Sequence, residues 1–262
     1  MLGLAIGVAL LGGCAFARLW EPSREEVLQR ILPSAVQVVI EQHEGRRIRT
    51  GSGVALASRR DGDRPVCFVL TAGHTVSGLV GQSQAYVVFG AYRGEARKAA
   101  ASVIASRDAA DVDLALLKTE GEHCMPPRAG GPALLGEPVW VVGFPWGRHM
   151  TLTRGIVSQV EVVDNGADRE TASRLMVDAP VSYGTSGGGV FGAREGELIG
   201  IVEGYSTARV TSQGANPSWY IDVPVPGQTY VTPLADVKRF LSRTSYAGLI
   251  EAASGRAGLA GP

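Results

Sequence analysis

Alternating hydrophobic and polar positions recur along most of the chain and predict short β-strands. In the first instance Val36, Val38 and Ile40 alternate with Gln37 and Glu41, a period of two that is typical of a half-buried strand. Similar runs follow at 52–57, 66–71, 85–89, 99–105 and 114–118, and later at 139–142, 151–163, 174–177, 189–191, 198–203 and 219–223. Two groups of about six short strands, separated by turn residues, predict an all-β sandwich or barrels.

A short helix is predicted on either side of these strands. Residues 23–26 (Ser-Arg-Glu-Glu) form a capping box, apolar residues follow at helical spacing, and Pro33 ends this first helix. Near the C-terminus Pro233 opens a second helical pattern. Its apolar face would carry Leu234, Val237, Phe240 and Leu241. We therefore expect each helix to pack one face against the strands.

The segment 121–132 is the best candidate for a linker, because it holds three Pro and three Gly in twelve residues. It divides the chain of 262 residues into two lobes. The first lobe, with its N-terminal segment, would span 21–120, and the second, with its closing helix, 133–245. Residues 246–262 are rich in small side chains and are expected to form a loose tail. A cleft between two such lobes is a natural place for a site.

The charge balance gives no reason to expect a nucleic-acid partner. Lys and Arg total 25 and Asp and Glu total 25, so the formal net charge is zero, and neither nucleic acid nor an anionic membrane is favoured. His123 and Cys124 are adjacent, and no Cys or His pair has the spacing of zinc ligands. We therefore expect no metal.

The N-terminal residues 1–20 form a separate apolar segment. Its first 19 residues carry one charge, Arg18, and Leu11-Gly12-Gly13-Cys14 resembles a bacterial lipobox. Lipid on Cys14 would tether the protein to a membrane. No Lys or Arg precedes the apolar run, unlike in a usual signal. An uncleaved anchor, an ordinary signal peptide and a cytosolic N-terminus therefore stay open as alternatives.

Cys67 and Cys124 are the other two cysteines. An exported chain permits a disulfide between them. However, Cys67 lies in an apolar strand and Cys124 in a polar loop, which favours two unpaired thiols with Cys67 as core filling.

A glycine-rich loop around Ser186 is the first candidate for chemistry. It reads Gly184-Thr185-Ser186-Gly187-Gly188-Gly189. No Lys follows the glycines, so a phosphate-binding P-loop is not favoured. An attacking serine needs its own N–H and that of Gly184 directed at one point, where they would hold a developing oxyanion. The composition therefore favours a nucleophile over a flexible turn.

The serine needs a base, and the base needs an orienting carboxylate. Among the four histidines His74 is the one that ends an apolar strand, which would hold the imidazole rigidly. Asp113 opens the apolar run 114–117, whereas its rival Asp111 lies outside that run and is expected to be solvated. His74 and Asp113 precede the linker and Ser186 follows it, so this predicted triad would form across the cleft.

These three blocks resemble the signature blocks of the chymotrypsin/trypsin superfamily, and more narrowly the protease domain of the bacterial HtrA group. The blocks are Thr71-Ala72-Gly73-His74, the run 113–117 and Gly184 to Gly188. Support comes from Gly51-Ser52-Gly53-Val54 and from the runs at 142–147, 155–158 and 196–201. The resemblance covers roughly residues 25–241. It implies two six-stranded β-barrels and hydrolysis of peptide bonds without a cofactor.

Two departures from the family pattern carry expectations of their own. Thr185 stands where activated trypsin-type enzymes carry an Asp that pairs with a new N-terminal amine, and the chain has no Ile-Val-Gly-Gly start. We therefore expect no zymogen cleavage, and an oxyanion loop ordered by local packing. The chain ends soon after the closing helix, so regulation through a PDZ domain is not expected.

Specificity is inferred from the family pattern, which puts the floor of the substrate pocket at Pro180. No acid occupies that position, so cleavage after Arg or Lys is not expected. Val181, Tyr183 and Tyr205 would line the pocket and favour a small or medium apolar side chain. Glu203 stands where a small polar residue is usual; it either turns to solvent or biases the pocket towards basic groups.

The leading hypothesis is an exported bacterial serine endopeptidase, lipid-anchored or periplasmic, that acts on polypeptides in envelope protein quality control. Two alternatives have lower weight: a pseudoprotease or peptide-binding module that keeps the fold without turnover, and an esterase that uses the same triad. The order His, Asp, Ser and the lack of a strand–Gly-x-Ser-x-Gly–helix context argue against an α/β-hydrolase. The oligomeric state is left open.

Overall fold

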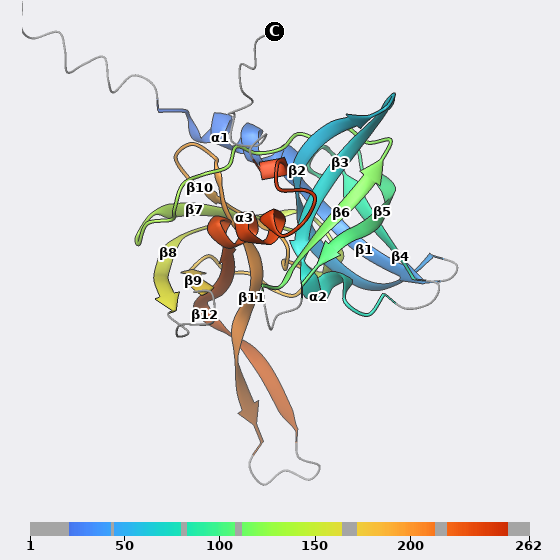
Figure 1. Ribbon diagram of the computed structural model, residues 1–262. Coiled ribbons are helices and arrows are strands. Elements are labelled where there is room, and N and C mark those ends of the chain that lie inside the picture. The colour runs from blue at the N-terminus through green and yellow to red at the C-terminus, as the bar shows by residue number, and fades with distance from the viewer. Residues whose placement is uncertain are drawn as a thin grey trace, which may run out of the picture.

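Two antiparallel sheets of six strands, each closed into a barrel, make up most of the computed structural model (Figure 1). It describes residues 21–42, 45–79, 83–107, 112–163, 172–212 and 219–250. The first barrel consists of β1 (Ala35–Gln42), β2 (Arg46–Asp61), β3 (Arg64–Ala72), β4 (Gln84–Phe89), β5 (Arg97–Ser106) and β6 (Leu114–Glu120). Around the barrel the order is β1-β2-β3-β6-β5-β4.

The second barrel repeats this order. It consists of β7 (Pro138–Gly143), β8 (Thr151–Val163), β9 (Ala172–Val177), β10 (Gly189–Gly192), β11 (Leu198–Thr211) and β12 (Tyr220–Pro233). The strands follow each other as β10-β11-β12-β9-β8-β7. The prediction of an all-β protein with two six-stranded barrels is therefore confirmed, as is the short helix near each end of the chain.

The strands of the first barrel that face the second carry two hydrophobic faces. In β2, Ala55 packs inside the barrel, whereas Val54 and Leu56 pack outside it, against residues of the other barrel. Strand β3 does the same, with Val69 inside and Leu70 outside. Because successive side chains point to opposite faces of a strand, both faces must be apolar where both are covered. This explains why these strands are nearly continuous hydrophobic runs.

The two helices close this arrangement from outside. Helix α1 (Arg24–Ile31) begins with the predicted capping box, in which the Glu26 N–H donates to Ser23 Oγ and the Ser23 N–H donates to Glu26 Oε2. Helix α3 spans Leu234–Ser242. All four residues of its predicted apolar face are buried in the cluster between the barrels. The helices thus help to fix how one barrel sits on the other.

The tail is ordered further than the sequence predicts. Leu249 and Ile250 are buried in the same cluster as α3, and the ring of Tyr246 contacts Phe68 of the first barrel with centroids 5.5 Å apart. The expectation of a loose tail from residue 246 is therefore wrong for 246–250. The prediction rested on the many small residues of the tail. The larger apolar side chains among them pack against the core and hold this part of the tail in place.

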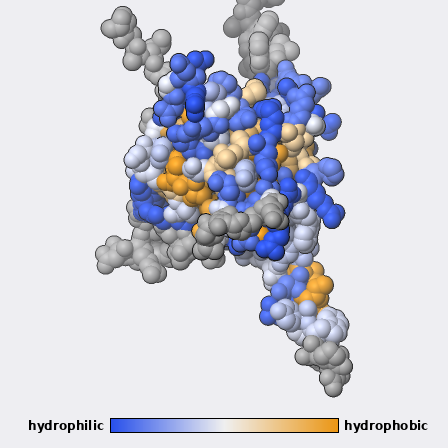
Figure 2. Space-filling model, turned by 90° about the vertical axis from the view of Figure 1, so that its right-hand side faces the viewer, coloured by the Kyte–Doolittle hydropathy of each residue, from blue (hydrophilic) through white to orange (hydrophobic). Residues whose placement is uncertain are grey.

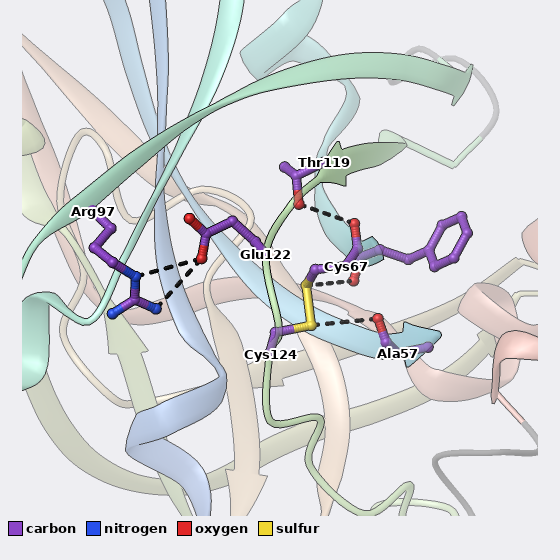
Figure 3. Close-up of a disulfide and its surroundings, with 7 residues drawn as sticks. Ala57, Cys67, Arg97, Thr119, Glu122 and Cys124 are labelled. Atoms are coloured by element: carbon purple, nitrogen blue, oxygen red, sulfur yellow. Dashed lines mark hydrogen bonds and ion pairs between the residues drawn. A yellow bond between two sulfur atoms is a disulfide. The ribbon is translucent and has the colours of Figure 1, made fainter. Parts of the chain in front are cut away.

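A disulfide joins Cys67 and Cys124, so the expectation of two unpaired thiols is wrong (Figure 3). The Cα atoms lie 5.8 Å apart. The segment after β6 runs back along β3, because the Gly121 N–H donates to the Pro65 carbonyl at 2.8 Å. Glu122 meets Arg97 of β5 at 3.4 Å in the same segment. This return of the chain brings the polar loop to the buried strand, which local sequence does not reveal.

Strands β11 and β12 are longer than predicted and leave the barrel as a two-stranded ribbon (Figures 1 and 2). The sequence predicts strands at 198–203 and 219–223, whereas the pairing in the structure runs from Gly200↔Pro233 to Thr211↔Tyr220. Two register shifts, one on either side of Gly204 and Tyr205, separate the barrel part from the outer part.

None of the helices in the described ranges is long and apolar enough to cross a membrane. The apolar segment 1–20, with Cys14, lies outside those ranges.

Candidate active site

The predicted base and its predicted carboxylate are brought together by the pairing of β3 with β6. The register Thr71↔Ala115 and Ala72↔Leu114 places the residue that precedes β6 beside the end of β3. His74 Nδ1 lies 2.7 Å from Asp113 Oδ2, and the His74 backbone N–H donates to Asp113 Oδ1 at 2.8 Å. One hydrogen bond at the imidazole ring and one at the backbone of His74 therefore hold this residue to the carboxylate. The rival Asp111 lies outside the described residues.

This pair has the exposure and electrostatics of a general base. The Asp113 side chain is 2% exposed, whereas that of His74 is 49% exposed. The hydrogen bond with Asp113 raises the pKa of His74 above its ordinary value of 6.5, and partial burial opposes it. Because the carboxylate accepts from Nδ1, Nε2 is left to act on a substrate or nucleophile.

Arg49 supports the short helix α2 (Gly73–Val76) that carries His74. Its Nη1 donates to the carbonyls of His74 at 2.7 Å and Ser77 at 2.6 Å. The guanidinium thereby occupies carbonyls at the end of α2 and lies near the imidazole. Its positive charge lowers the pKa of His74, and the negative charge of Glu203 raises it.

Ser186 lies in the loop between β9 and β10, and it faces the same cavity as His74. The cavity has a volume of about 320 Å³ and is lined by Arg49, Thr50, His74, Thr75, Trp146, Tyr183, Gly184 and Ser186. The Ser186 carbonyl accepts from the Ser52 N–H of the first barrel at 2.8 Å, and the Gly187 N–H donates to Val202 of β11 at 2.7 Å. The predicted nucleophile is thus held between the two barrels.

Two backbone N–H groups beside Ser186 are available to a ligand. Among the described residues the N–H groups of Gly184 and Ser186 donate to no protein acceptor. The Tyr183 carbonyl, which shares a peptide with the Gly184 N–H, accepts from Trp146 at 2.6 Å. Because the two groups of a trans peptide point in opposite directions, this bond turns the Gly184 N–H away from Trp146.

Unusual backbone conformations make this arrangement possible. Gly184 has φ +88°, and a Cβ there would meet Phe144 O and Trp146 N at 2.8 Å. Trp146 has φ +57° and is the one non-glycine residue with positive φ in the described part of the chain. Such a conformation costs about 1–2 kcal/mol for an ordinary residue. The ring of Trp146 contacts Tyr183 at 5.2 Å and offsets part of this cost.

Ser52 links the oxyanion loop to both barrels, a role that the sequence does not assign to it. Its Oγ donates to the Gly184 carbonyl at 2.7 Å and accepts from the Phe144 N–H at 2.7 Å. Thr185, in place of the family's Asp, is buried, and its N–H donates to the Ser182 carbonyl at 3.0 Å. Neutral hydrogen bonds therefore order the loop in this structure.

The predicted substrate-pocket residues fall into two places. Tyr183 lines the cavity that contains Ser186, and its ring meets Tyr205 at 5.7 Å, edge to face. Burial, helped by the neighbouring Tyr183, raises the pKa of Tyr205 to about 12, so this phenol stays neutral. Pro180 and Val181 instead line a second cavity of about 280 Å³, together with Thr185.

Trp146, Thr50 and Arg49 line the cavity although sequence reasoning assigned none of them to the site. Trp146 is 64% exposed and so has an unusually accessible indole for a folded protein. The available signal was a tryptophan within the motif 142–147, whereas its exposure is apparent only in the structure.

The chain matches the family of the trypsin-like peptidase domain over residues 51–201, more than half of its length. It is 35% identical over 114 residues to Protease Do-like 2, chloroplastic, from Arabidopsis thaliana, which covers 42% of this chain and 18% of that protein. With the serine endoprotease DegS from Haemophilus influenzae it shares 25% identity over 177 residues, 66% of this chain and 47% of DegS. The chain spans less than half the length of these curated relatives.

Two solved structures share the fold. A serine endoprotease from Yersinia pestis superposes with a TM-score of 0.60 at 21% identity, over 88% of this chain and 67% of that chain. Rv3671c from M. tuberculosis H37Rv, in an inactive mutant form, gives a TM-score of 0.57 at 22% identity, over 83% and 89%. At these identities the likeness extends to the fold alone.

Proposed function

The chain belongs to the trypsin-like peptidase family, and on this premise we propose that it is a serine endopeptidase with His74, Asp113 and Ser186 as its triad. The observation that carries the proposal is the pairing of His74 with a buried Asp113 at 2.7 Å, in a cavity that Ser186 also lines. Gly184 and Ser186 supply the two N–H groups of the oxyanion hole. No cofactor takes part in this proposal.

Acylation follows from these positions. Ser186 Oγ forms a bond to the carbonyl carbon of the scissile peptide, its proton passes to His74 Nε2, and the carbonyl π pair moves onto oxygen. The N–H groups of Gly184 and Ser186 stabilise that oxyanion. When the carbon–nitrogen bond breaks, the leaving amine takes the proton from His74, and Ser186 remains acylated.

Deacylation repeats the sequence with water. His74 removes a proton from the water as its oxygen attacks the acyl carbon, and the oxyanion forms in the same place. Collapse breaks the bond to Ser186 Oγ, which recovers the proton from His74. Asp113 stays ionised throughout and stabilises the imidazolium that forms twice in each turnover.

We further propose that the enzyme prefers small or medium apolar side chains on the acyl side of the cleaved bond. Tyr183 lines the cavity that contains Ser186, and its ring meets that of Tyr205, so aromatic surface lies beside the proposed nucleophile. Pro180 and Val181 line the neighbouring cavity and offer no charge to a basic side chain there. Cleavage of a peptide library, read by mass spectrometry, tests this preference. Cleavage mainly after Arg or Lys would contradict it and would assign Glu203 the dominant role.

The proposed substrates are polypeptides of the bacterial cell envelope, reached by a chain that is exported and lipid-anchored through Cys14. This proposal is supported by the sequence of residues 11–14. Metabolic labelling with an alkyne fatty acid tests it: label is expected on the wild type and absent from Cys14→Ser. Equal labelling of both chains would place any lipid elsewhere.

The experiment that tests the enzymatic proposal is labelling of the folded full chain with a fluorophosphonate probe. Wild type is expected to label at Ser186, and labelling is expected to disappear in Ser186→Ala and in His74→Ala. A folded wild type that does not label, but whose Ser186→Ala variant binds peptides as well as the wild type does, would favour the pseudoprotease alternative.

A further inference from the structure

The outer parts of β11 and β12 form a ribbon with no third strand. The ribbon, defined here as 207–211 with 219–224, is paired from Thr207↔Pro224 to Thr211↔Tyr220. In the barrel β10 pairs with β11 up to Ile201, and β9 pairs with β12 from Thr229 onward. Within the described residues the ribbon therefore has two open edges, and it projects from the second barrel (Figure 1).

The two faces of this ribbon differ in character. Directly opposite residues share a face, and successive residues alternate. One face carries Thr207, Arg209, Thr211, Tyr220, Asp222 and Pro224. The other, which we call the apolar face, carries Ala208, Val210, Trp219, Ile221 and Val223.

The polar face is satisfied internally. The Arg209 guanidinium lies 4.2 Å from the Tyr220 ring centroid and makes two hydrogen bonds to Asp222, at 2.8 and 3.0 Å. The charges of Arg209 and Asp222 offset each other, so this face selects neither an anionic nor a cationic partner. These contacts also show, independently of the strand register, that Arg209, Tyr220 and Asp222 lie on one side of the ribbon.

The apolar face is left in water. Val210 is 48%, Ile221 53% and Trp219 56% exposed, and hydrophobic residues are visible on the projecting ribbon in Figure 2. An exposed apolar patch with a polar surround marks an interaction site. A two-stranded ribbon is only marginally stable in water, so a partner that covered this face would also stabilise the ribbon.

The ribbon continues a strand that passes the catalytic cavity. Strand β11 passes the proposed nucleophile, because the Val202 N–H donates to Gly188 and the Val202 carbonyl accepts from Gly187. Three residues later Tyr205 contacts Tyr183 in the wall of the catalytic cavity. Val210 follows Tyr205 by five residues, at most about 17 Å along the strand at about 3.3 Å per residue, because the register shift between Tyr205 and Thr207 bends β11. An extended chain that leaves the cavity past Tyr205 would therefore run along the ribbon.

We propose that the apolar face binds an extended, apolar segment of the polypeptide substrate, roughly five to eight residues from the bond that is cleaved. This inference rests on the proposed peptidase function and adds a substrate class to it: polypeptides with an exposed apolar stretch at a fixed distance from the cleavage site. The open edge of β11 can add backbone hydrogen bonds to the same segment.

Matched peptide substrates test the proposal. A short fluorogenic peptide ends near the cavity, and a long one carries the same cleavage site plus ten apolar-rich residues, added on one side or the other. The test variant combines Val210→Thr, Ile221→Thr and Val223→Thr, which keeps β-branched side chains in the strands. Val160→Thr on β8 is the control, because Val160 is also 48% exposed but lies outside the ribbon.

The triple variant is expected to raise the KM of one long peptide by on the order of tenfold with kcat unchanged, as for lost uniform binding. The short peptide and the Val160→Thr control are expected to behave as the wild type does. Equal KM values for the long peptides in the triple variant and the wild type would overturn the proposal. A change that is the same for short and long peptides would do so as well.

Binding measured without turnover separates this inference from the peptidase proposal. Fluorescence anisotropy of the labelled long peptide is measured on Ser186→Ala, with and without the three ribbon substitutions, and weaker binding in the latter is expected. This result would stand even if the wild type failed to label with the fluorophosphonate. If the substitutions instead change only the sedimentation of the protein alone, the apolar face binds a second copy of this chain and the proposal fails.

Discussion

The two barrels hold their parts of the proposed active site by different means. In the first barrel His74 and Asp113 follow directly from the register of β3 and β6, continuous from Val66 to Ala72, so the pair is fixed by the sheet itself. In the second barrel Ser186 and Gly184 lie in a loop, which is held by hydrogen bonds from Ser52 of the first barrel and from Trp146. The first barrel alone therefore positions the proposed base, whereas the proposed oxyanion loop depends on contacts between the two barrels.

The largest expected effect on activity comes from disrupting the pair of His74 and Asp113 in the first barrel. Asp113→Asn keeps the shape of the side chain but presents an amide to His74 Nδ1 and favours the wrong tautomer. We expect kcat to fall by about 10⁴-fold with little change in KM. Steady-state kinetics on a short peptide measures this. A loss of less than tenfold in a variant with unchanged thermal unfolding would remove Asp113 from the proposed triad.

Breaking the second-barrel side is expected to cost less. Trp146→Pro removes the N–H that holds the Tyr183 carbonyl and cannot adopt positive φ, so the Gly184 N–H loses its orientation. We expect kcat to fall by about 10²–10³-fold, as for loss of one oxyanion donor. Trp146→Gly keeps the N–H and adopts positive φ freely, so it is the matched control and should stay within several-fold of the wild type.

Circular dichroism and thermal unfolding of both Trp146 variants show whether the fold is kept. If Trp146→Gly loses as much activity as Trp146→Pro, the indole ring acts on the substrate directly, and the backbone account of the oxyanion loop is wrong.

The same contrast decides what could be predicted from sequence. Strands that are buried on both faces appear in the sequence as long apolar runs. His74 and Asp113 stand at the ends of two such runs, so the sequence pattern alone pointed to this pair in the first barrel. The glycines around Ser186 singled it out as the predicted nucleophile, and the structure places it in the cavity that His74 also lines. Trp146 acts through its backbone N–H, which every residue except proline carries, so its identity signals nothing about that role.

Features that depend on the path of the chain in space were missed for a related reason. The disulfide needs the segment after β6 to return along β3, and no local pattern near Cys124 encodes that return. The outer half of β11 alternates only weakly, because Gly204 and Ser206 interrupt it and Ala208 is small. The sequence-based strand therefore ended at residue 203, eight positions short of the structure.

Removing the disulfide is expected to affect stability and leave the chemistry intact. Cys67→Ala with Cys124→Ala opens a loop of 57 residues in sequence separation, and we expect the free energy of unfolding to fall by about 2–4 kcal/mol. Cys67 lies seven residues before His74 on β3, and this strand is held by its pairing with β2 and β6 as well as by the disulfide. We therefore expect kcat to change by less than about twofold. Urea unfolding and kinetics measure the two effects. Loss of activity without loss of stability would mean that the disulfide shapes the base instead of the barrel.

The smallest expected effect concerns the charges that the two barrels direct at His74. The hydrogen bond with Asp113 is the main cause that raises the pKa of His74; Arg49 of the first barrel lowers it, and Glu203 of the second raises it. Catalysis needs the neutral imidazole, so kcat/KM should fall as pH drops through this raised pKa. The sign for stability is opposite: the ion pair with Asp113 stabilises fully below pH 6.5 and is lost as pH rises through the folded pKa.

Two neutralising substitutions therefore separate the contributions of the barrels. Glu203→Gln should lower the pKa of His74 and move the acidic limb of kcat/KM to lower pH, whereas Arg49→Gln should move it to higher pH. Glu195→Gln, an exposed carboxylate on the turn before β11, is the control and should leave the limb in place. Because Arg49 also holds two carbonyls at α2, its variant is compared at equal folded fraction. If both substitutions move the limb in the same direction, the base responds to a shift of the interface between the barrels, and the two charges do not act on it separately.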